Sequence, residues 1–354
     1  MDGQGPWLTV NLSAIERNVR RFSGLVGVPV MPMIKANAYG LGAVSVARAL
    51  EAAGPWGYGV ASLAEARVLR DAGIERPIMA FWPFRPEWLD EYLALRVRPA
   101  IGDLRGLDAW IGRSAGPFHL EIDTGMGRAG FRWHDTDTLA ALPERLADSP
   151  WFEGIFTHFA SADLSEAATE TQWSRLVEMM TGLGRRPPLV HAANSAAGQW
   201  RGRYAGTLAR PGIFLYGGHA GPLLGESVAH LAAAVVAVRP IRGGDPVSYG
   251  GAFAALADGE VATLAIGYAD GVHRTLGKCG VVSIGGRDWP IAGRITMDMT
   301  MVVAPRGAVA VGQTATIFGG PVGLDAQAGR AGTISYELLT AVGPRVVRRY
   351  QEAP

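Results

Sequence analysis

The pattern of hydrophobic and polar positions divides the chain into two parts. From about residue 28 to 216, short apolar runs alternate with segments whose apolar residues recur at helical spacing, such as Leu63–Ala72, Arg85–Leu95 and Glu170–Leu183. The apolar runs are Val28–Ile34, Gly57–Ala61, Pro77–Phe81, Val97–Ile101, Phe118–Ile122, Gly154–His158, Pro188–His191 and Leu208–Leu215. Eight strand-like runs alternating with helices predict an α/β fold, a closed (β/α)8 barrel of the TIM type. A doubly wound open sheet is the competing interpretation.

After about residue 225, strand-like runs follow one another with little helix between them. They are Ala229–Ile241, Glu260–Ile266, Gly280–Ile284, Met299–Val303 and Gln313–Phe318, and turns rich in Gly, Asp and Pro separate them. An early run, Trp7–Val10, precedes the barrel and is free to pair with these later strands. We therefore expect a barrel over residues 11–224 and a mainly-β domain formed by residues 1–10 and 225–354.

Composition and charge exclude several classes of protein. The 354 residues are 48% hydrophobic, which is ample for one large or two smaller cores. A net charge of +1 offers no basic surplus for nucleic acid or an anionic membrane. The single cysteine, Cys279, allows no intrachain disulfide. The N-terminal residues do not resemble a signal peptide and no apolar run is long enough to span a bilayer, so we expect a cytoplasmic protein.

Lys35 stands where the first barrel strand is expected to end. It lies in the segment Met33–Gly40 (MIKANAYG), between an apolar run and the helical segment Ala43–Ala52. Ligands bind at this end of the strands in parallel α/β folds. The pKa of an amine among apolar neighbours is lowered, which makes it a nucleophile toward aldehydes. Taken alone, Lys35 would be interpreted as a solvated surface lysine.

Polar segments also follow four of the later strands. Glu121–Arg128 (EIDTGMGR) follows the fifth run, Thr157–Asp163 the sixth and His191–Ala196 the seventh, and Arg210–Ile213 belongs to the eighth. Any one of them could make only structural hydrogen bonds. Because all four lie at the same end of successive strands, together they predict a single site.

Together with Lys35, these segments resemble the alanine racemase family of fold-type III pyridoxal-phosphate enzymes. The resemblance covers nearly the whole chain, including the second domain. The matching segments there are VSYG (247–250), IGYADG (266–271), GRITMD (293–298) and GPRVVRRY (343–350). The lysine segment and the Tyr-Ala-Asp-Gly segment are the most specific of them.

The resemblance implies that the barrel binds pyridoxal 5'-phosphate, covalently at Lys35, and that no metal is needed. The phosphate would be bound by neutral donors of the barrel and by Tyr350, while Arg210 would face the pyridine nitrogen with His158 as its hydrogen-bond partner. The residues expected to bind the cofactor are Lys35, Tyr39, His158, Asn194, Ser195, Arg210, Gly212, Ile213 and Tyr350.

The implied reaction is the interconversion of L-alanine and D-alanine by two bases. Lys35 would act on one face of the α-carbon, and Tyr249 from the partner subunit of a homodimer would act on the other. Without the resemblance, Tyr249 would be interpreted as a strand tyrosine packed against a core. The residues expected to bind substrate are Arg128, the backbone of Met297, Tyr268 and Asp298. The family supplies D-alanine for the cell wall.

Position 121 departs from the family pattern. Alanine racemases often carry a carbamylated lysine two residues before the Asp-Thr-Gly-Met-Gly-Arg segment, whereas this chain has Glu121. One interpretation is that Glu121 pairs with Arg128, with a water or an anion completing the contact. The other is that Glu121 makes no such contact and Arg128 is oriented in another way.

Three alternative functions share parts of this pattern. A racemase of serine or another small amino acid would share nearly all of these residues. A decarboxylase on the same scaffold is disfavoured, because such enzymes place an acid at the pyridine nitrogen and a cysteine near the α-carbon, where this chain has Arg210 and Tyr249. A non-catalytic pyridoxal-phosphate carrier resembles the barrel alone, so the long segment after the barrel argues against it.

Overall fold

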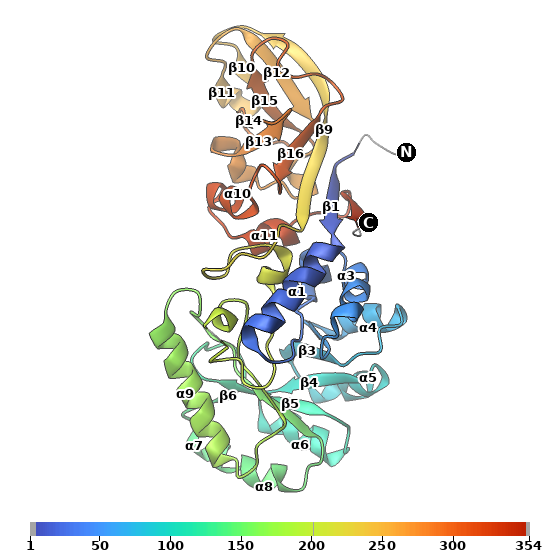
Figure 1. The fold of residues 1–354 in the computed structure, drawn as a ribbon, viewed down its shortest axis with the longest axis vertical. Coiled ribbons are helices and arrows are strands. Elements are labelled where there is room, and N and C mark those ends of the chain that lie inside the picture. Colours follow the sequence, from blue (N-terminus) through green and yellow to red (C-terminus); the bar gives the residue numbers. More distant parts are fainter. Residues whose placement is uncertain (1–4, 201, 352–354) are drawn as a thin grey trace.

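A computed structural model describes residues 5–200 and 202–351 and shows two lobes stacked along the long axis of the molecule (Figure 1). The lower lobe contains the parallel strands, and the upper lobe is rich in antiparallel strands. None of the helices in these residues is both long enough and apolar enough to cross a lipid bilayer.

The parallel strands of the lower lobe form a closed barrel. The sheet runs β2 (Tyr58–Val60), β3 (Ile78–Pro83), β4 (Val97–Ile101), β5 (Phe118–Asp123), β7 (Phe152–Phe156) and β8 (Leu189–His191), and the short β6 (Phe131–Arg132) pairs with β5. Two further segments complete the ring, because Met33 bridges Gly59 and Val30 bridges Ala209, both in parallel. The Thr207 and Leu208 amides donate to the Val190 carbonyl, which joins the last segment to β8. The predicted barrel is therefore confirmed and the open sheet is excluded.

Helices surround the barrel, and capping side chains set where several of them begin. They are α1 (Leu12–Val26), α3 (Ala43–Leu50), α4 (Leu63–Asp71), α5 (Leu89–Ala94), α6 (Leu104–Gly112), α7 (Thr136–Ala140), α8 (Leu142–Ala147) and α9 (Glu166–Gly182). Ser62 caps α4 by accepting from the Glu65 amide. Ser165 caps α9 in the same way, so this helix begins four residues before the expected Glu170.

The antiparallel strands of the upper lobe are arranged around β9 (Ala229–Ile241), the longest strand. One path runs β14 (Arg287–Pro290), β13 (Val281–Ile284), β16 (Thr314–Phe318), β9, β1 (Trp7–Asn11) and β17 (Val347–Gln351). β12 (Gly259–Leu264) pairs with β9 and with β15 (Thr300–Ala304), and β10 (Pro246–Val247) pairs with β11 (Phe253–Ala254). Two helices follow, α10 (Leu324–Ala331) and α11 (Ser335–Thr340).

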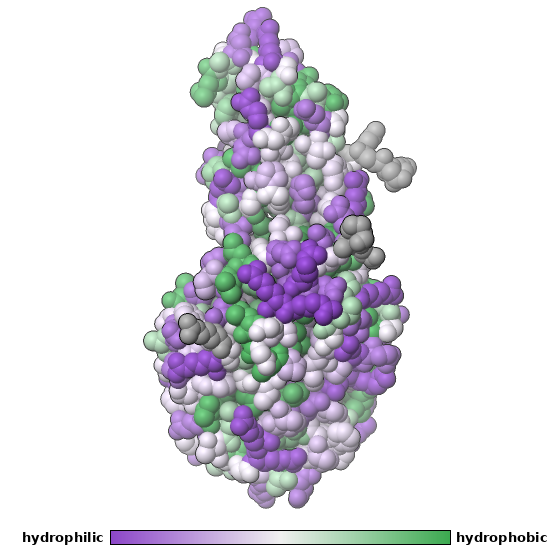
Figure 2. All heavy atoms as spheres, in the orientation of Figure 1, coloured by the Kyte–Doolittle hydropathy of each residue, from purple (hydrophilic) through white to green (hydrophobic). Residues whose placement is uncertain are grey.

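The first strand of the chain belongs to the sheet of the upper lobe. β1 pairs antiparallel with β9, where Leu8 lies opposite Leu231, and parallel with β17, where Leu8 lies opposite Arg348. This pairing supports a domain that is discontinuous in sequence, while the boundary near residue 224 stays a prediction. Figure 2 shows hydrophilic side chains gathered over α1, near the junction of the two lobes. Arg17 of α1 forms an ion pair with Glu226, which links this helix to the segment before β9.

Candidate active site

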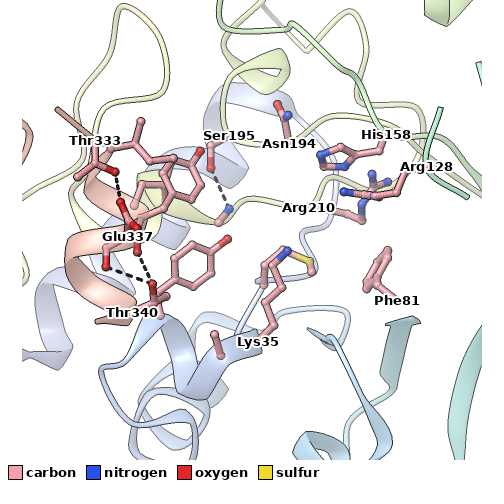
Figure 3. Close-up of a pocket in the computed structure, with 17 residues that line it drawn as sticks. Lys35, Phe81, Arg128, His158, Asn194, Ser195, Arg210, Thr333, Glu337 and Thr340 are labelled. Atoms are coloured by element: carbon pink, nitrogen blue, oxygen red, sulfur yellow. Dashed lines mark hydrogen bonds between the residues drawn. The ribbon is translucent and has the colours of Figure 1, made fainter. Parts of the chain in front are cut away.

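A cavity of about 530 Å³ opens at the carboxyl ends of the barrel strands. Figure 3 shows Lys35 on one side of it, with Arg128, His158 and Arg210 grouped together and Thr333, Glu337 and Thr340 opposite them. Nine residues predicted from the sequence line it, namely Lys35, Tyr39, Arg128, His158, Asn194, Ser195, Arg210, Gly212 and Ile213. The structure therefore brings together polar segments from five strand ends, and what each residue binds stays a prediction.

Lys35 begins a turn of unusual backbone geometry. In α2 (Lys35–Tyr39), the four residues from Ala36 to Tyr39 have φ between 52° and 56°, which is the left-handed region. This conformation costs about 1–2 kcal/mol per residue for side chains with a Cβ. Glu65 of α4 helps to hold it, because its carboxylate accepts from the Ala36 amide at 2.8 Å and from the Ala61 amide at 2.7 Å. The turn fixes where the lysine leaves the strand.

The environment of Lys35 favours the neutral amine. Burial lowers the pKa of its ammonium, and the positive charges of Arg128 and Arg210 lower it further, against an opposing effect of Glu65. A neutral amine in a cavity is the form that attacks a carbonyl carbon. The expectation drawn from the apolar neighbours of Lys35 therefore agrees with the charges around it.

Arg210 is fully buried in the wall of the cavity. Its Nη2 donates to the Thr157 carbonyl at 2.8 Å, and its Nη1 donates to Nδ1 of His191 at 2.7 Å and to the His191 carbonyl. Burial lowers the pKa of the guanidinium to about 9, so it remains a cation at neutral pH. The prediction that His158 is the hydrogen-bond partner of Arg210 was wrong. Arg210 extends into the barrel interior, where His191 provides both a ring nitrogen and a carbonyl as acceptors.

His158 lines the cavity beside Arg210, Arg128 and Lys35. Burial, followed by the charges of Arg210, Arg128 and Lys35, lowers its pKa to about 3, so the imidazole is neutral. Its backbone is fixed by Gln172 of α9, whose Nε2 donates to the His158 carbonyl at 3.2 Å and to Thr124 Oγ1 at 3.1 Å. His158 can therefore accept a hydrogen bond in the cavity without adding charge.

One corner of the cavity is lined by neutral hydrogen-bonding groups. Ser195 Oγ accepts from the backbone N–H of Gly212 at 2.8 Å and of Phe214 at 3.2 Å, where the 3₁₀ helix η4 (Ile213–Tyr216) begins. A Cβ at Gly212 would overlap the hydroxyl of Tyr39, so only glycine allows this close approach. Such a corner, in which the Ser195 and Tyr39 hydroxyls lie beside the start of a 3₁₀ helix, suits a phosphate group.

Asn194 also lines the cavity, but its side chain serves the backbone. Its Oδ1 accepts from the amides of Ala196 and Ala197 at 3.0 and 2.9 Å and so closes the turn that leads into the 3₁₀ helix η3 (Ala197–Gln199). This turn contains the neighbouring Ser195, whose hydroxyl contacts Gly212. Asn194 therefore acts on the corner indirectly, through the loop that carries Ser195.

Arg128 reaches the cavity from a glycine-rich loop that Asp123 organises. Asp123 Oδ1 accepts from the amides of Gly125 and Gly127 at 3.1 and 2.9 Å. Glu121 lies nearby and is only 5% exposed, yet within residues 5–200 no ion pair under 4 Å joins it to Arg128. Its Oε2 has no hydrogen-bond partner in the described part of the chain. Burial raises the pKa of Glu121 to about 7, against the charges of Arg128 and Arg210.

Part of the cavity wall comes from residues that sequence reasoning missed. Thr333, Ile334, Tyr336, Glu337 and Thr340, from α11 and the loop before it, all line the cavity. Tyr336 packs on Tyr39 with ring centroids 5.9 Å apart. In the sequence these residues show only a short segment of helical spacing, Thr333–Val342, with no polar motif. Tyr350, in contrast, is not among the residues that line the cavity; its hydroxyl lies against Gly42.

The other expected residues lie on an exposed face of the upper lobe, which we call the Tyr249 face. Tyr249 is 70% exposed in the 3₁₀ turn η5 (Tyr249–Gly251) and shares a shallow hollow with Thr296. Tyr268 and Met297 lie beside it, because the Tyr268 and Ala269 amides donate to the carbonyls of Thr296 and Met297. None of these residues lines the described cavity of the same protomer.

Asp298 follows Met297 on the Tyr249 face, and its carboxylate is engaged within the domain. Its Oδ1 accepts from Arg345 Nη1 at 2.8 Å, and the same guanidinium donates through Nε to Asp270 at 2.9 Å. The ion pairs hold the loop that carries Met297 against the 3₁₀ helix η6 (Tyr268–Asp270). Asp298 is therefore placed to shape this face rather than to bind a ligand by itself.

Comparisons with known proteins agree over the full length. The family model described as alanine racemase, N-terminal domain, matches residues 10–220, and the one described as alanine racemase, C-terminal domain, matches residues 228–350. Alanine racemase from Limosilactobacillus fermentum is 37% identical over 367 residues, which cover 97% of each chain.

Solved structures agree as well. Alanine racemase from D-cycloserine-producing Streptomyces lavendulae superimposes with a TM-score of 0.92 at 29% identity and covers 100% of this chain and 99% of its own. The Bartonella henselae enzyme, solved with covalently bound pyridoxal phosphate, gives a TM-score of 0.91 at 28% identity and covers 98% and 99%. The sequence matches, the shared architecture and the cavity at the barrel mouth lead to one conclusion: this chain belongs to the alanine racemase family.

Proposed function

We propose that this protein is a pyridoxal-phosphate-dependent racemase that interconverts L-alanine and D-alanine. The observation that carries the proposal is a single cavity that contains a lysine amine with a lowered pKa, a buried arginine and a corner of neutral hydrogen-bond donors. The proteins to which it is similar in sequence are named alanine racemase. A cytoplasmic role in supplying D-alanine for the cell wall follows from the family.

The residues of the cavity fit pyridoxal phosphate. Lys35 provides the amine for covalent attachment, and the corner of Ser195, Gly212 and Tyr39 would hold the phosphate. Arg210 would face the pyridine nitrogen as a cation and keep a proton off it. When bound, the cofactor withdraws electrons from the substrate and makes the hydrogen on its α-carbon acidic. The fit rests on glycine at position 212, since a side chain there would overlap Tyr39.

Racemisation by two bases requires a proton donor or acceptor on each face of the α-carbon, and Lys35 can serve only one face. Lys35 lies in the cavity, whereas Tyr249 lies on an exposed face of the other lobe. We propose that a homodimer brings the Tyr249 of one subunit to the cavity of the other. The high exposure of Tyr249, Met297 and Tyr268 supports this arrangement, because apolar and aromatic side chains are enriched at subunit contacts.

Substrate binding would use groups from both halves of this composite site. Arg128 lines the cavity, and its guanidinium would bind the substrate carboxylate. The backbone N–H of Met297 from the partner subunit would donate a second hydrogen bond to the same carboxylate. Tyr268 would narrow the entrance and limit the size of the side chain. Because alanine carries only a methyl group, a narrow entrance favours it over larger amino acids.

A racemisation assay tests the proposal directly. Purified protein with added pyridoxal phosphate is incubated with L- and D-forms of several amino acids, and the enantiomers are separated by chiral chromatography. We expect alanine to react fastest, and faster turnover of serine would favour the racemase of another small amino acid. Cofactor trapped on Lys35 by borohydride, with no interconversion of any amino acid, would show a non-catalytic carrier instead.

A further inference from the structure

A chain of polar side chains runs through the barrel interior, from the cavity to the opposite end of the barrel. Barrel interiors are ordinarily filled by apolar side chains, as with the neighbouring Met31, Met79 and Leu208. His119 and Glu153 are the second residues of β5 and β7, near the strand starts, whereas the cavity lies at the strand ends. The chain consists of Arg210, His191, His119, Glu153 and Arg98.

Every link of this chain is a short contact. Arg210 Nη1 lies 2.7 Å from His191 Nδ1, and His191 Nε2 lies 2.7 Å from His119 Nδ1. His119 Nε2 lies 3.0 Å from Glu153 Oε2, which also accepts from Arg98 Nε at 2.8 Å. Both imidazoles and the Arg210 guanidinium are fully buried, while Glu153 and Arg98 are partly exposed.

Aromatic rings and one glycine hold the two imidazoles in place. The His191 ring stacks on Phe156 at 4.9 Å with an interplanar angle of 8°, and Trp56 contacts His119 edge-on at 5.9 Å. A Cβ at position 154 would overlap His119 Nδ1, so Gly154 leaves the space that the ring occupies. The rings therefore have little freedom to turn away from their partners.

The two ends of the chain determine where each proton lies. The guanidinium of Arg210 can only donate, so His191 Nδ1 must accept and its proton must be on Nε2. This proton is donated to His119 Nδ1, which puts the His119 proton on Nε2, facing Glu153. Glu153 is ionised, because donation from His119 and Arg98 outweighs its burial and lowers its pKa to about 2. Burial lowers the pKa of both histidines and keeps them neutral.

We propose that Glu153 is a positioning residue for Arg210, acting from the far end of the barrel by fixing the tautomers of His119 and His191. Without the acceptor at position 153, the Nε2–H of His119 is left buried and unpaired, and this cost opposes the effect of Arg210 and favours a proton on Nδ1 instead. His191 would then have to accept at Nε2 and carry its own proton on Nδ1, which faces an arginine that can only donate. The guanidinium would lose the bond that orients it toward the cavity.

The catalytic consequence rests on the proposed function, in which Arg210 faces the cofactor ring. A shift of this guanidinium would misplace the charge beside the pyridine nitrogen without altering any residue that lines the cavity. Misplacement by a remote change can cost about 10- to 100-fold in rate. We therefore expect Glu153→Leu to lower kcat by this factor and to leave KM for alanine less affected.

Histidine ¹⁵N NMR of the full-length protein tests the tautomers without any assay of activity. The chain has seven histidines, which single substitutions to Gln assign. We expect His119 and His191 both to be protonated at Nε2 only. A proton on Nδ1 of either ring in the unaltered protein would overturn the proposal, and this measurement does not depend on any variant at position 153 folding.

Three variants distinguish the effect of losing the Glu153 acceptor from the effect of losing its ion pair with Arg98. Glu153→Leu should give Nδ1-protonated His119 or His191, whereas Glu153→Gln keeps an accepting oxygen and should preserve both tautomers and kcat. Arg98→Gln breaks the same ion pair but leaves the Glu153 carboxylate, so it should preserve the tautomers as well. Unchanged tautomers in a folded Glu153→Leu protein would contradict the proposal. Absence of racemisation in the unaltered protein would instead contradict the proposed function and leave the NMR result standing.

Discussion

The barrel cavity and the Tyr249 face differ in how their polar groups are satisfied. Around the cavity, Arg210, Ser195, Asn194 and the backbone of Lys35's turn make hydrogen bonds within the protomer. On the Tyr249 face, tyrosine and methionine side chains are exposed, with Tyr249 at 70%, Met297 at 53% and Tyr268 at 42%. Under the proposed function, one half of the site is organised within a single protomer, whereas the Tyr249 face would be completed by a second copy.

The largest expected effect comes from removing the acid/base group on the exposed face. Tyr249→Phe should lower kcat for alanine by about 10²–10⁴-fold, because a hydroxyl that transfers a proton contributes this much. Cofactor attachment to Lys35 should persist, since Tyr249 does not line the cavity of its own protomer. Chiral chromatography measures the first outcome and borohydride trapping the second.

Mixing two inactive variants shows which subunit supplies the tyrosine. In a dimer of one Lys35→Ala and one Tyr249→Phe protomer, a site that uses the partner's tyrosine is fully intact once per dimer. Random exchange of the two should restore roughly a quarter of the normal activity per protomer. If Tyr249 served its own protomer, both sites of the mixed dimer would lack a base, and no activity would return.

A smaller effect concerns how the stability of the protein depends on pH through the buried Glu121 beside the cavity. The pKa of Glu121 is raised to about 7, so its contribution to stability is complete below about pH 4.5 and is lost as pH rises through 7. Glu121→Gln removes this titration. Relative to the unaltered protein, its free energy of unfolding should rise by about 3 kcal/mol between pH 4.5 and pH 8. Urea unfolding of cofactor-free protein at both pH values measures this difference.

A matched control and a kinetic measurement complete the test. Glu178→Gln removes an exposed carboxyl on α9 and should show no such pH-dependent gain. KM for alanine in Glu121→Gln should rise by less than about threefold, because no close ion pair joins Glu121 to Arg128. A tenfold rise in KM would show instead that Glu121 positions Arg128.

Next in size is the effect of filling the cofactor corner. Gly212→Ala places a methyl group against the Tyr39 hydroxyl, and such overpacking costs about 1–3 kcal/mol. We expect the affinity for pyridoxal phosphate to fall by about tenfold, measured by titration of cofactor-free protein. Gly329→Ala, on α10 with nothing within 4 Å of the added Cβ, is the control and should not change it. Equal affinity in both variants would remove Gly212 from the phosphate site.

The smallest effect concerns substrate size at the exposed face. Tyr268→Ala should widen the entrance and raise kcat/KM for amino acids larger than alanine, relative to alanine, by roughly threefold. Tyr268→Phe keeps the ring and should preserve the ratio. An unchanged ratio in Tyr268→Ala would show that Tyr268 does not limit the side chain.

The alternation of apolar runs was sufficient to predict the barrel, because its strands are largely buried on both faces and therefore mostly apolar. The strands β14 and β17 were missed for the opposite reason. Half of Arg287–Pro290 is charged, and most of Val347–Gln351 is charged or polar. The place of these strands in the sheet depends on their pairing partners rather than on their own pattern.

For the site, polar motifs at strand ends identified the barrel residues, since those side chains are close together wherever the barrel closes. Neither the wall formed by Tyr336 and Glu337 nor the bond of Arg210 to His191 could be predicted in this way. Both depend on how the last helix lies over the barrel and on which way a buried guanidinium turns. Such choices are made by three-dimensional packing and leave no spacing in the sequence.

The pairing of β1 with β17 also constrains when the sheet of the upper lobe can finish folding during synthesis of the chain. Trp7 lies beside Val347, so β1 cannot pair with β17 until almost all 354 residues have been translated. At about 5–20 residues per second, the time between synthesis of β1 and synthesis of β17 is roughly 20–70 s. During it β9 can cover one edge of β1, while the other edge stays open. Because α11 also lines the cavity, the cavity wall is complete only after nearly the whole chain has been synthesised.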